Sequence, residues 1–297
     1  MGKLRLGYLY TLSPMHPGGE ANLGNILDIV RETHTNFPYL PGSSLRGCLR
    51  DEVKFSGEPE AEKIADRLFG KELDTSTGEM GIHQVWFGDA RLLWVPMRTM
   101  AIEGKGDAFT WVSCHTLIRD HAILSGNIDD LSINFSNKPL GTQIGTYIVA
   151  DSQIKVDNQE KLDTSKISSY SPKEWPNRLG KVVEKTWENN HIILPDDDFY
   201  VLMEHALWTQ IRNKLSSEDS DPDVQSGSAE VFWTDICIPR DTIMYFPWGY
   251  RKSKTVSSED RDARSTLESL IEGLFQVGGQ ANVGRGWVQG WTASDSL

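Results

Sequence analysis

The sequence lacks the features of membrane and secreted proteins. Across its 297 residues no apolar run approaches the roughly 20 residues that cross a bilayer, and the N-terminus has no signal-peptide core. Leu6 stands where N-myristoylation needs serine or threonine. The three cysteines, Cys48, Cys114 and Cys237, are far apart and lack the spacing of zinc ligands. These absences predict a cytoplasmic protein with reduced thiols and no membrane partner.

Positive charge is also scarce for a protein that would bind nucleic acid. The 30 Lys and Arg residues are outnumbered by 42 Asp and Glu residues, so the formal net charge is −12 at pH 7. Binding depends on where charges lie rather than on their sum. The acidic residues concentrate in apparent loops at 196–198 and 218–223. The basic residues outside these blocks are Arg46, Arg50, Arg285 and the run 251–254. We therefore expect an acidic surface with local basic grooves.

Hydrophobic periodicity predicts strands and helices in an informative order. Alternating or continuous apolar residues predict strands at 3–12, 85–95, 108–117, 146–150, 192–194, 230–238 and 242–246, and another that begins at Trp287. Helical spacing predicts helices at 43–53, 59–68, 198–215 and 265–275. Gly70 would end the second of these, and Ser265 with Glu268 would form a capping box in the last. Strand–helix–strand at each end indicates one α+β domain over residues 1–297, with a ferredoxin-like (RRM-like) core and insertions.

Two stretches are candidates for the insertions. Residues 125–195 are polar and weakly periodic, which is typical of an inserted or functional loop. The acidic stretch that begins at Ser216 leads into the predicted strands 230–238 and 242–246, which Pro239-Arg240-Asp241 would join as a hairpin. We therefore expect insertions within 125–195 and 216–246.

A turn followed by a basic helix is the best candidate for an anion site. Pro41-Gly42 forms the turn, and Ser43 or Ser44 would cap the helix by accepting its free N–H groups. Arg46 and Arg50 share one helix face, and such a helix start suits a phosphate. The simpler interpretation is that the arginines are solvated and the serines are only a cap.

A polar loop before this helix carries His16, Glu20 and Asp28. A lone aspartate in such a loop is commonly a turn carboxylate. His16 is more often a loop hydrogen-bonding group than a general base. No Ser–His–Asp or Cys–His constellation fits by spacing. Residue types alone therefore leave the function of this loop open.

The glycine-rich stretch 277–286 excludes two classes of nucleotide-binding protein. It follows a predicted helix and precedes a predicted strand, whereas dinucleotide and P-loop fingerprints need the reverse order, and it lacks a Lys-Ser/Thr pair. Its glycines allow positive φ or close approach of a partner's backbone. A turn without a ligand and backbone binding to RNA are equally compatible with the pattern.

Four motifs, spread from end to end, resemble the RAMP superfamily of CRISPR effector subunits, and within it the repeated backbone subunit of type III-B (Cmr) complexes. The motifs are residues 10–19 (YTLSPMHPGG), 37–50 (FPYLPGSSLRGCLR), 88–93 (GDARLL) and 277–286 (VGGQANVGRG). The resemblance implies a ferredoxin-like palm formed by both ends of the chain, with a β-hairpin thumb. It further implies a filament of copies along a guide crRNA, which cuts complementary single-stranded target RNA at regular intervals beside other effector subunits.

The resemblance also implies roles for particular residues. Asp28 falls where the family has a loop aspartate needed for metal-dependent cleavage, so it would be catalytic and would hold Mg²⁺ or Mn²⁺. His16 would support it, and Asp235 would be a reduced acidic helper, because Trp233-Thr234-Asp235 stands where relatives have an aromatic–acid–acid run. The guide would be held by Ser43, Ser44, Arg46, Arg50, Gly278, Gly279, Gly284, Arg285 and Gly286.

Two other interpretations remain open. A scaffold that binds guide RNA without cleaving the target would share every motif, although such a scaffold has no need of a carboxylate near a phosphate. A metabolic α+β enzyme is the third interpretation. The missing nucleotide fingerprint and the order of the four motifs argue against it.

Overall fold

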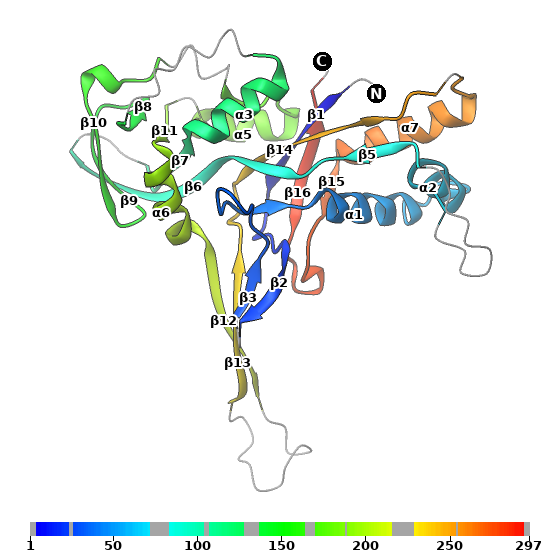
Figure 1. Cartoon of the computed structure of the whole chain (residues 1–297), viewed down its shortest axis with the longest axis horizontal. Coiled ribbons are helices and arrows are strands. Elements are labelled where there is room, and N and C mark those ends of the chain that lie inside the picture. The colour runs from blue at the N-terminus through cyan, green and yellow to red at the C-terminus, as the bar shows by residue number, and fades with distance from the viewer. Residues whose placement is uncertain are drawn as a thin grey trace, which may run out of the picture.

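A twisted β-sheet crosses the molecule, and a narrower sheet projects from it (Figure 1). The computed structural model describes residues 4–23, 26–71, 83–103, 107–127, 137–163, 170–187, 189–215, 229–253 and 255–293. Within these ranges no helix is long and apolar enough to cross a membrane.

The elements follow one another in this order: β1 (Arg5–Thr11), β2 (Gly18–Leu23), β3 (Ile26–Ile29), β4 (Tyr39–Leu40), α1 (Gly42–Lys54), α2 (Ala61–Phe69), β5 (Val85–Phe87), β6 (Ala90–Glu103), β7 (Phe109–Cys114), α3 (His115–Ser125), β8 (Leu140–Gly141), β9 (Gly145–Val149), β10 (Ser152–Val156), η2 (Asn158–Glu160), α5 (Asn177–Trp187), β11 (His191–Leu194), α6 (Asp196–Ala206), β12 (Trp208–Leu215), β13 (Ala229–Cys237), β14 (Ile243–Tyr250), α7 (Ser258–Ile271), β15 (Leu274–Gln276), η3 (Ala281–Val283) and β16 (Trp287–Thr292).

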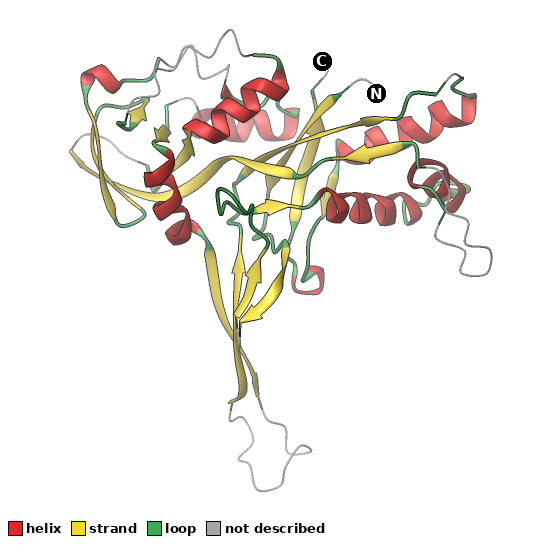
Figure 2. Ribbon diagram, viewed as in Figure 1, coloured by secondary structure: helices red, strands yellow, loops and turns green. Residues whose placement is uncertain are grey.

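Strand β1 lies inside the main sheet, whose order is β15-β16-β1-β14-β6-β7-β11-β8. It pairs antiparallel with β14 and with β16, so that Tyr8 lies opposite Tyr245 on one side and Trp291 on the other. Alternation predicted a half-buried strand, but β1 is buried on both faces from Leu6 onward. The reason is that helices cover both faces of the sheet (Figure 2).

Two hydrophobic cores occupy these two faces. On one face α1, α2, α6 and α7 pack their apolar stripes, among them the fully buried Leu45, Leu49 and Leu267. Fully burying one leucine contributes about 1.5–3 kcal/mol. On the other face α3 and α5 cover an aromatic core, where Trp111 and Trp187 lie 4.9 Å apart between ring centroids.

The hairpin predicted from 230–238 and 242–246 is wrong, because the two strands belong to different sheets. Its order is β12-β13-β3-β2, and β13 pairs antiparallel with β12 and parallel with β3. Strand β14 belongs to the main sheet, so 230–238 and 242–246 form strands but do not pair with each other. The chain changes sheets between them, because Ile238 is buried and exchanges backbone hydrogen bonds with Met15. The part of 216–246 at 216–228 lies outside the described residues.

The helix predicted at 198–215 is wrong beyond Ala206. Leu207 has an extended backbone, and Trp208–Leu215 forms strand β12. Ile211, expected on the buried stripe, is 72% exposed. The long antiparallel pairing with β13 overrides the local periodicity here.

The predicted boundaries of two helices differ in how well they agree with the structure. Helix α2 ends at Gly70, as predicted. Helix α7 begins earlier than predicted, and its capping box is Ser257 with Asp260, so Ser265 and Glu268 lie inside it. The described part of 125–195 is more regular than predicted, because it contains β8 to β11 and α5.

Candidate functional site

Two of the four motifs, 10–19 and 277–286, meet the end of β13 at the base of the narrower sheet. Met15 and Ile238 exchange backbone hydrogen bonds of 2.9 and 2.8 Å. The N–H of Gly279 donates to the carbonyl of His16 at 2.8 Å, and the N–H of Gly286 donates to Pro14 at 2.9 Å. The N-terminal loop, the glycine-rich stretch and the end of β13 therefore form one unit.

His16 forms part of this unit rather than an exposed catalytic group. Its side chain is 8% exposed, and Nδ1 lies 2.8 Å from the carbonyl oxygen of Ile236. Because a carbonyl only accepts, Nδ1 carries the proton of this hydrogen bond. His16 thereby ties the loop to β13, and its predicted support of Asp28 remains a prediction.

Two glycines of the stretch are required by its backbone. Gly278 has φ +79°, and a Cβ there would lie 2.6 Å from the carbonyl oxygen of His16. Gly286 has φ +76°, and a Cβ there would lie 1.9 Å from the carbonyl oxygen of Val277. Gly284 also has positive φ (+77°), but its Cβ would meet nothing within 4 Å, and at Gly279 a Cβ would make only ordinary contact. A turn held by its own contacts thus explains Gly278 and Gly286.

Asp235 and Arg285 are buried partners. Asp235 is fully buried, and its Oδ2 lies 3.0 Å from Nη2 of Arg285 and 3.3 Å from Nη1 of Arg212. Arg285 is 4% exposed and also donates to Oε1 of Gln210 at 2.9 Å. Arg285 was predicted to contact the guide, and Asp235 was predicted to be an acidic helper. In the structure their side chains contact each other.

Asp28 lies on strand β3 rather than in a loop. Asp235 pairs with Leu27 in the parallel β3–β13 ladder. Because successive side chains of a strand alternate between faces, Asp28 and Asp235 lie on opposite faces of the narrower sheet. The Asp28 side chain is 35% exposed, and its Oδ1 accepts the N–H of Ile29 at 2.8 Å.

A divalent cation fits Asp28 only as a site completed by substrate. Among the described residues there is no group of three or more His, Cys, Asp or Glu side chains that could hold a metal ion. Magnesium is commonly held by one or two carboxylates together with phosphate oxygens and water. The contacts of Asp28 with Ile29 and Arg31 use Oδ1, so Oδ2 is the oxygen available to a cation.

The arginines of α1 contact α2. Arg46 donates through Nη2 to the carbonyl of Phe69 and lies over that ring, 5.6 Å from its centroid. Partial burial and the nearby Arg50 lower the pKa of Arg46. Arg50 Nη2 lies 3.4 Å from Oδ1 of Asp66. Both arginines therefore help to pack the two helices, and their predicted binding of guide phosphates remains a prediction.

Neither serine caps α1 in the predicted way. The cap residue is Pro41, without a side-chain cap hydrogen bond, and the N–H of Gly42 donates instead to Oδ1 of Asp89 at 2.8 Å. Ser43 is exposed and Ser44 is half-buried. The motifs at 37–50 and 88–93 thus meet at this helix start, where a carboxylate already takes one of the free N–H groups.

Cys48 connects α1 to the glycine-rich stretch. Burial raises the pKa of its thiol, and a hydrogen bond with the backbone of Gly278 opposes that effect. The helix carrying Ser43, Arg46 and Arg50 therefore lies beside the turn carrying Gly278. The structure brings these predicted guide-binding residues into one region.

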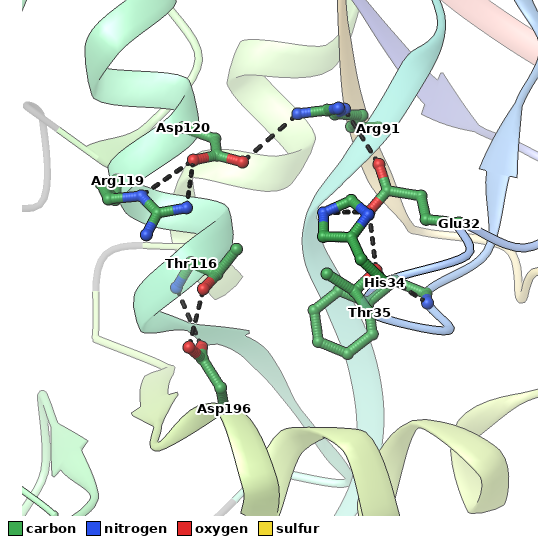
Figure 3. Close-up of polar contacts among 9 residues, drawn as sticks. Glu32, His34, Thr35, Arg91, Thr116, Arg119, Asp120 and Asp196 are labelled. Atoms are coloured by element: carbon green, nitrogen blue, oxygen red, sulfur yellow. Dashed lines mark hydrogen bonds and ion pairs between the residues drawn. The ribbon is translucent and has the colours of Figure 1, made fainter.

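A network of charges fixes the turn that follows β3, as Figure 3 shows. Nε of Arg91 lies 3.0 Å from Oε1 of Glu32, and its Nη1 lies 3.3 Å from Oδ2 of Asp120 on α3. Thr35 donates its hydroxyl to Oε2 of Glu32 at 2.7 Å. The turn beginning at Glu32 is therefore anchored to β6, and through Arg91 to α3.

Sequence reasoning missed Arg31 and Glu204. Arg31 lies three residues after Asp28, and its Nη2 is 3.8 Å from Oδ1 of that carboxylate. Glu204 comes from α6 and forms a two-point contact with Arg31, with distances of 2.6 and 3.2 Å. The spacing of Asp28 and Arg31 was visible in the sequence, but nothing there indicated a partner on α6.

The fold and this site define a mixed α-β protein whose described termini are both built into one large sheet and whose motifs gather at the base of a second, narrower one. The RAMP superfamily profile matches residues 8–289. The chain therefore belongs to the RAMP superfamily.

More specific likenesses cover almost the whole chain. It is similar to the CRISPR system Cmr endoribonuclease Cmr4 of Pyrococcus furiosus, with 29% identity over 299 residues, covering 95% of this chain and 92% of that protein. The crystal structure of oligomeric Cmr4 from Pyrococcus furiosus matches with a TM-score of 0.67 and 20% identity, over 100% of this chain and 99% of that one. A chain in the cryo-EM structure of the type III-B Cmr-beta bound to cognate target RNA matches with a TM-score of 0.72 and 16% identity. The match covers 97% of this chain and 96% of that one. These structures share the fold.

Proposed function

We propose that this chain is the repeated backbone subunit of a type III-B CRISPR RNA-guided complex. In this role it binds guide crRNA along a filament of copies and cleaves complementary target RNA at regular intervals. The observation that carries the proposal is 29% identity to a Cmr endoribonuclease over 95% of the chain. Its partners are then the guide, single-stranded target RNA, further copies of itself and other subunits of the complex, in the cytoplasm.

The strand order supports a ferredoxin-like palm. The neighbours β16-β1-β14-β6 are all antiparallel, α1 lies between β1 and β6 in the chain, and α7 lies between β14 and β16. This is the βαββαβ order of a ferredoxin-like sheet. The projecting hairpin β12–β13 is then the thumb (Figure 1), in place of the hairpin expected from 230–246.

Asp28 is the residue on which cleavage depends in this proposal. It is a half-exposed carboxylate at the junction of the palm and the thumb, on the strand that pairs with β13. A bound Mg²⁺ or Mn²⁺ would neutralise charge on the scissile phosphate. The chain's own part is to hold one carboxylate there and to splay the target RNA, so that a 2′-hydroxyl lines up on its phosphate.

The guide-binding residues fall into two groups under this proposal. Ser43, Ser44, Arg46 and Arg50 lie on α1 beside the glycine-rich stretch, where a sugar–phosphate backbone would pass. Arg285 is buried and holds the stretch from within, so its contribution is to position the turn that the guide meets. Because base pairing reads the target, the protein recognises backbone and shape.

A scaffold that binds guide RNA without cleaving the target is the second candidate function. The observation that favours it is that Asp28 has an arginine 3.8 Å away and that the described residues supply no group of three or more His, Cys, Asp or Glu side chains for a metal ion. Both the cleaving subunit and the scaffold require guide RNA. Copurification of RNA with the complex separates them from a metabolic enzyme.

The test is cleavage of guide-complementary RNA by the assembled complex, with and without Mg²⁺. We expect regularly spaced, metal-dependent products from the wild type and none from Asp28→Asn, while both bind target equally. Asp107→Asn, at an exposed aspartate before β7, is the matched control and should cleave normally. Tight target binding without cuts in the wild type would establish the scaffold.

A further inference from the structure

Arg31 is held beside Asp28 by a carboxylate from a distant helix. Its Nη1 and Nη2 contact Oε1 and Oε2 of Glu204 at 2.6 and 3.2 Å, and Nη1 also donates to the carbonyl of Asn36 at 3.3 Å. The same Nη2 lies 3.8 Å from Oδ1 of Asp28. A two-point contact between guanidinium and carboxylate fixes the plane of the arginine as well as its charge.

The backbone around Arg31 is fixed too. Arg31 forms an antiparallel bridge with Pro38, and Glu32 donates its N–H to the carbonyl of Phe37 at 2.9 Å. The side chain of Glu32 is anchored by Arg91. The Arg31 side chain is only 15% exposed, whereas that of Asp28 is 35% exposed. Arg31 is therefore the more buried member of this pair.

These contacts give the two oxygens of the Asp28 carboxylate different surroundings. Oδ1 accepts the N–H of Ile29 and faces the guanidinium of Arg31, so it is turned toward the protein. A cation must then approach through Oδ2. Arg31 also repels that cation, and Glu204 weakens the repulsion because it neutralises much of the guanidinium charge.

We propose that Arg31, clamped by Glu204, is a positioning residue of the cleavage site. It sets the orientation of the Asp28 carboxylate and lowers the affinity of that carboxylate for a divalent cation, so that a cation is held there only together with RNA phosphates. This inference rests on the proposed function. The cluster of Asp28, Arg31 and Glu204 carries one net negative charge with Arg31 and two without it, which is why the cation affinity reports on Arg31.

The experiment measures Mn²⁺ binding by electron paramagnetic resonance. It uses the assembled complex, loaded with a target RNA that has 2′-deoxy nucleotides at the cleavage positions, so that no product forms. Arg31→Gln should tighten Mn²⁺ binding about two- to fivefold, since a partly exposed ion pair is weak. Glu204→Gln should weaken it by a similar factor, because Arg31 then faces Asp28 alone.

Cleavage of ordinary target RNA by the same complexes gives the second readout. Arg31→Gln should lower the maximal rate despite tighter Mn²⁺ binding. Arg31→Lys, which keeps the charge but loses the two-point contact, should keep the Mn²⁺ affinity and still lower the rate. Arg98→Gln is the matched control. Arg98 lies on β6 and forms an exposed ion pair with Asp151, away from the cluster of Asp28, Arg31 and Glu204. It should change neither quantity.

The outcomes separate this inference from the proposed function. A purely structural role for Arg31 would reduce the yield of assembled complex without moving Mn²⁺ affinity, and this result would overturn the inference. If Arg31→Gln and Glu204→Gln shift the affinity in the same direction, the inference is also wrong. If the wild-type complex neither cleaves nor binds more Mn²⁺ than Asp28→Asn, the proposed function fails and the inference fails with it.

Discussion

Arg285 and Asp235 form a buried ion pair that joins the glycine-rich stretch to the base of the projecting hairpin. Nη2 of Arg285 lies 3.0 Å from Oδ2 of Asp235. The guanidinium also lies over the ring of Trp208, 4.6 Å from its centroid, and Nη1 is 3.1 Å from Sγ of Cys237. Two residues with separate predicted roles, Arg285 in guide binding and Asp235 as an acidic helper, are therefore partners that hold the glycine-rich stretch and the hairpin together.

Removing one partner of this pair should be more harmful than replacing both. Arg285→Met leaves the Asp235 carboxylate buried with Arg212 and Gln280 as its remaining partners among the described residues. One-sided loss of a buried pair costs about 3–5 kcal/mol. We expect Arg285→Met with Asp235→Leu to recover most of that loss, because no fully buried charge is then left unpaired, and Arg212, which also loses Asp235, has a side chain that is 32% exposed. Urea denaturation of the purified chain measures the free energy of unfolding.

Arg240→Met is the control for this cycle. Arg240 pairs with its neighbour Asp241, and its side chain is 73% exposed. It should change stability by less than about 0.5 kcal/mol. Additive losses in the double variant at Arg285 and Asp235 would show that the two side chains do not act as a pair.

Gly284 and Gly286 offer a matched test of close approach. Both have positive φ, so alanine at either site should cost about 1 kcal/mol from backbone strain. A Cβ at Gly286 would also lie 1.9 Å from the carbonyl oxygen of Val277, whereas at Gly284 it would meet nothing. Gly286→Ala should therefore be clearly more destabilising than Gly284→Ala in thermal unfolding. Equal losses would mean that the turn relaxes without cost.

Stability should fall in mild acid because two histidines are buried uncharged. Burial lowers the pKa of His121 and of His191 to about 3, from the ordinary value of 6.5. Between these values the unfolded chain binds more protons than the folded one, so stability is present above pH 6.5 and is lost as pH falls. Each histidine contributes a slope of about 1.4 kcal/mol per pH unit.

The variant His191→Leu tests this slope. Both ring nitrogens of His191 lack a hydrogen-bond partner among the described residues, and the ring lies among Trp94, Trp111 and Trp187. Leucine should therefore be tolerated at pH 8 and should flatten the pH dependence between pH 6 and pH 4. His34→Ala, at a side chain 69% exposed, should leave the slope unchanged. An unaltered slope in His191→Leu would contradict the assignment.

Helix α1 should depend on Asp89 rather than on its own serines. Asp89→Ala removes the acceptor for the N–H of Gly42 and should cost about 1 kcal/mol. Ser43→Ala should be nearly neutral, because Ser43 makes no cap hydrogen bond. Hydrogen exchange of the first-turn amides of α1 should accelerate only in the Asp89 variant. Faster exchange only in Ser43→Ala would instead support the serine cap that the sequence predicted.

The sequence was most informative where structure depends on neighbours in the chain. The end of α2 at Gly70, strand β1 and the glycine-rich turn all follow from local periodicity or from backbone conformations that favour glycine. The family resemblance was also local, because it rests on four short motifs, and the match over residues 8–289 confirmed it. The choice of Asp28 as the catalytic carboxylate came from that resemblance and stays a prediction.

Only the tertiary structure decided which distant segments meet. It made Trp208–Leu215 a strand against its helical periodicity, because β13 supplied a partner along its whole length. It paired Asp235 with Arg285, and it brought Glu204 to Arg31 across 173 positions of the chain. Local patterns fix backbone preference and which face is apolar. Pairing between remote segments depends on burial and charge that form only when the whole chain folds, so no short stretch of sequence contains it.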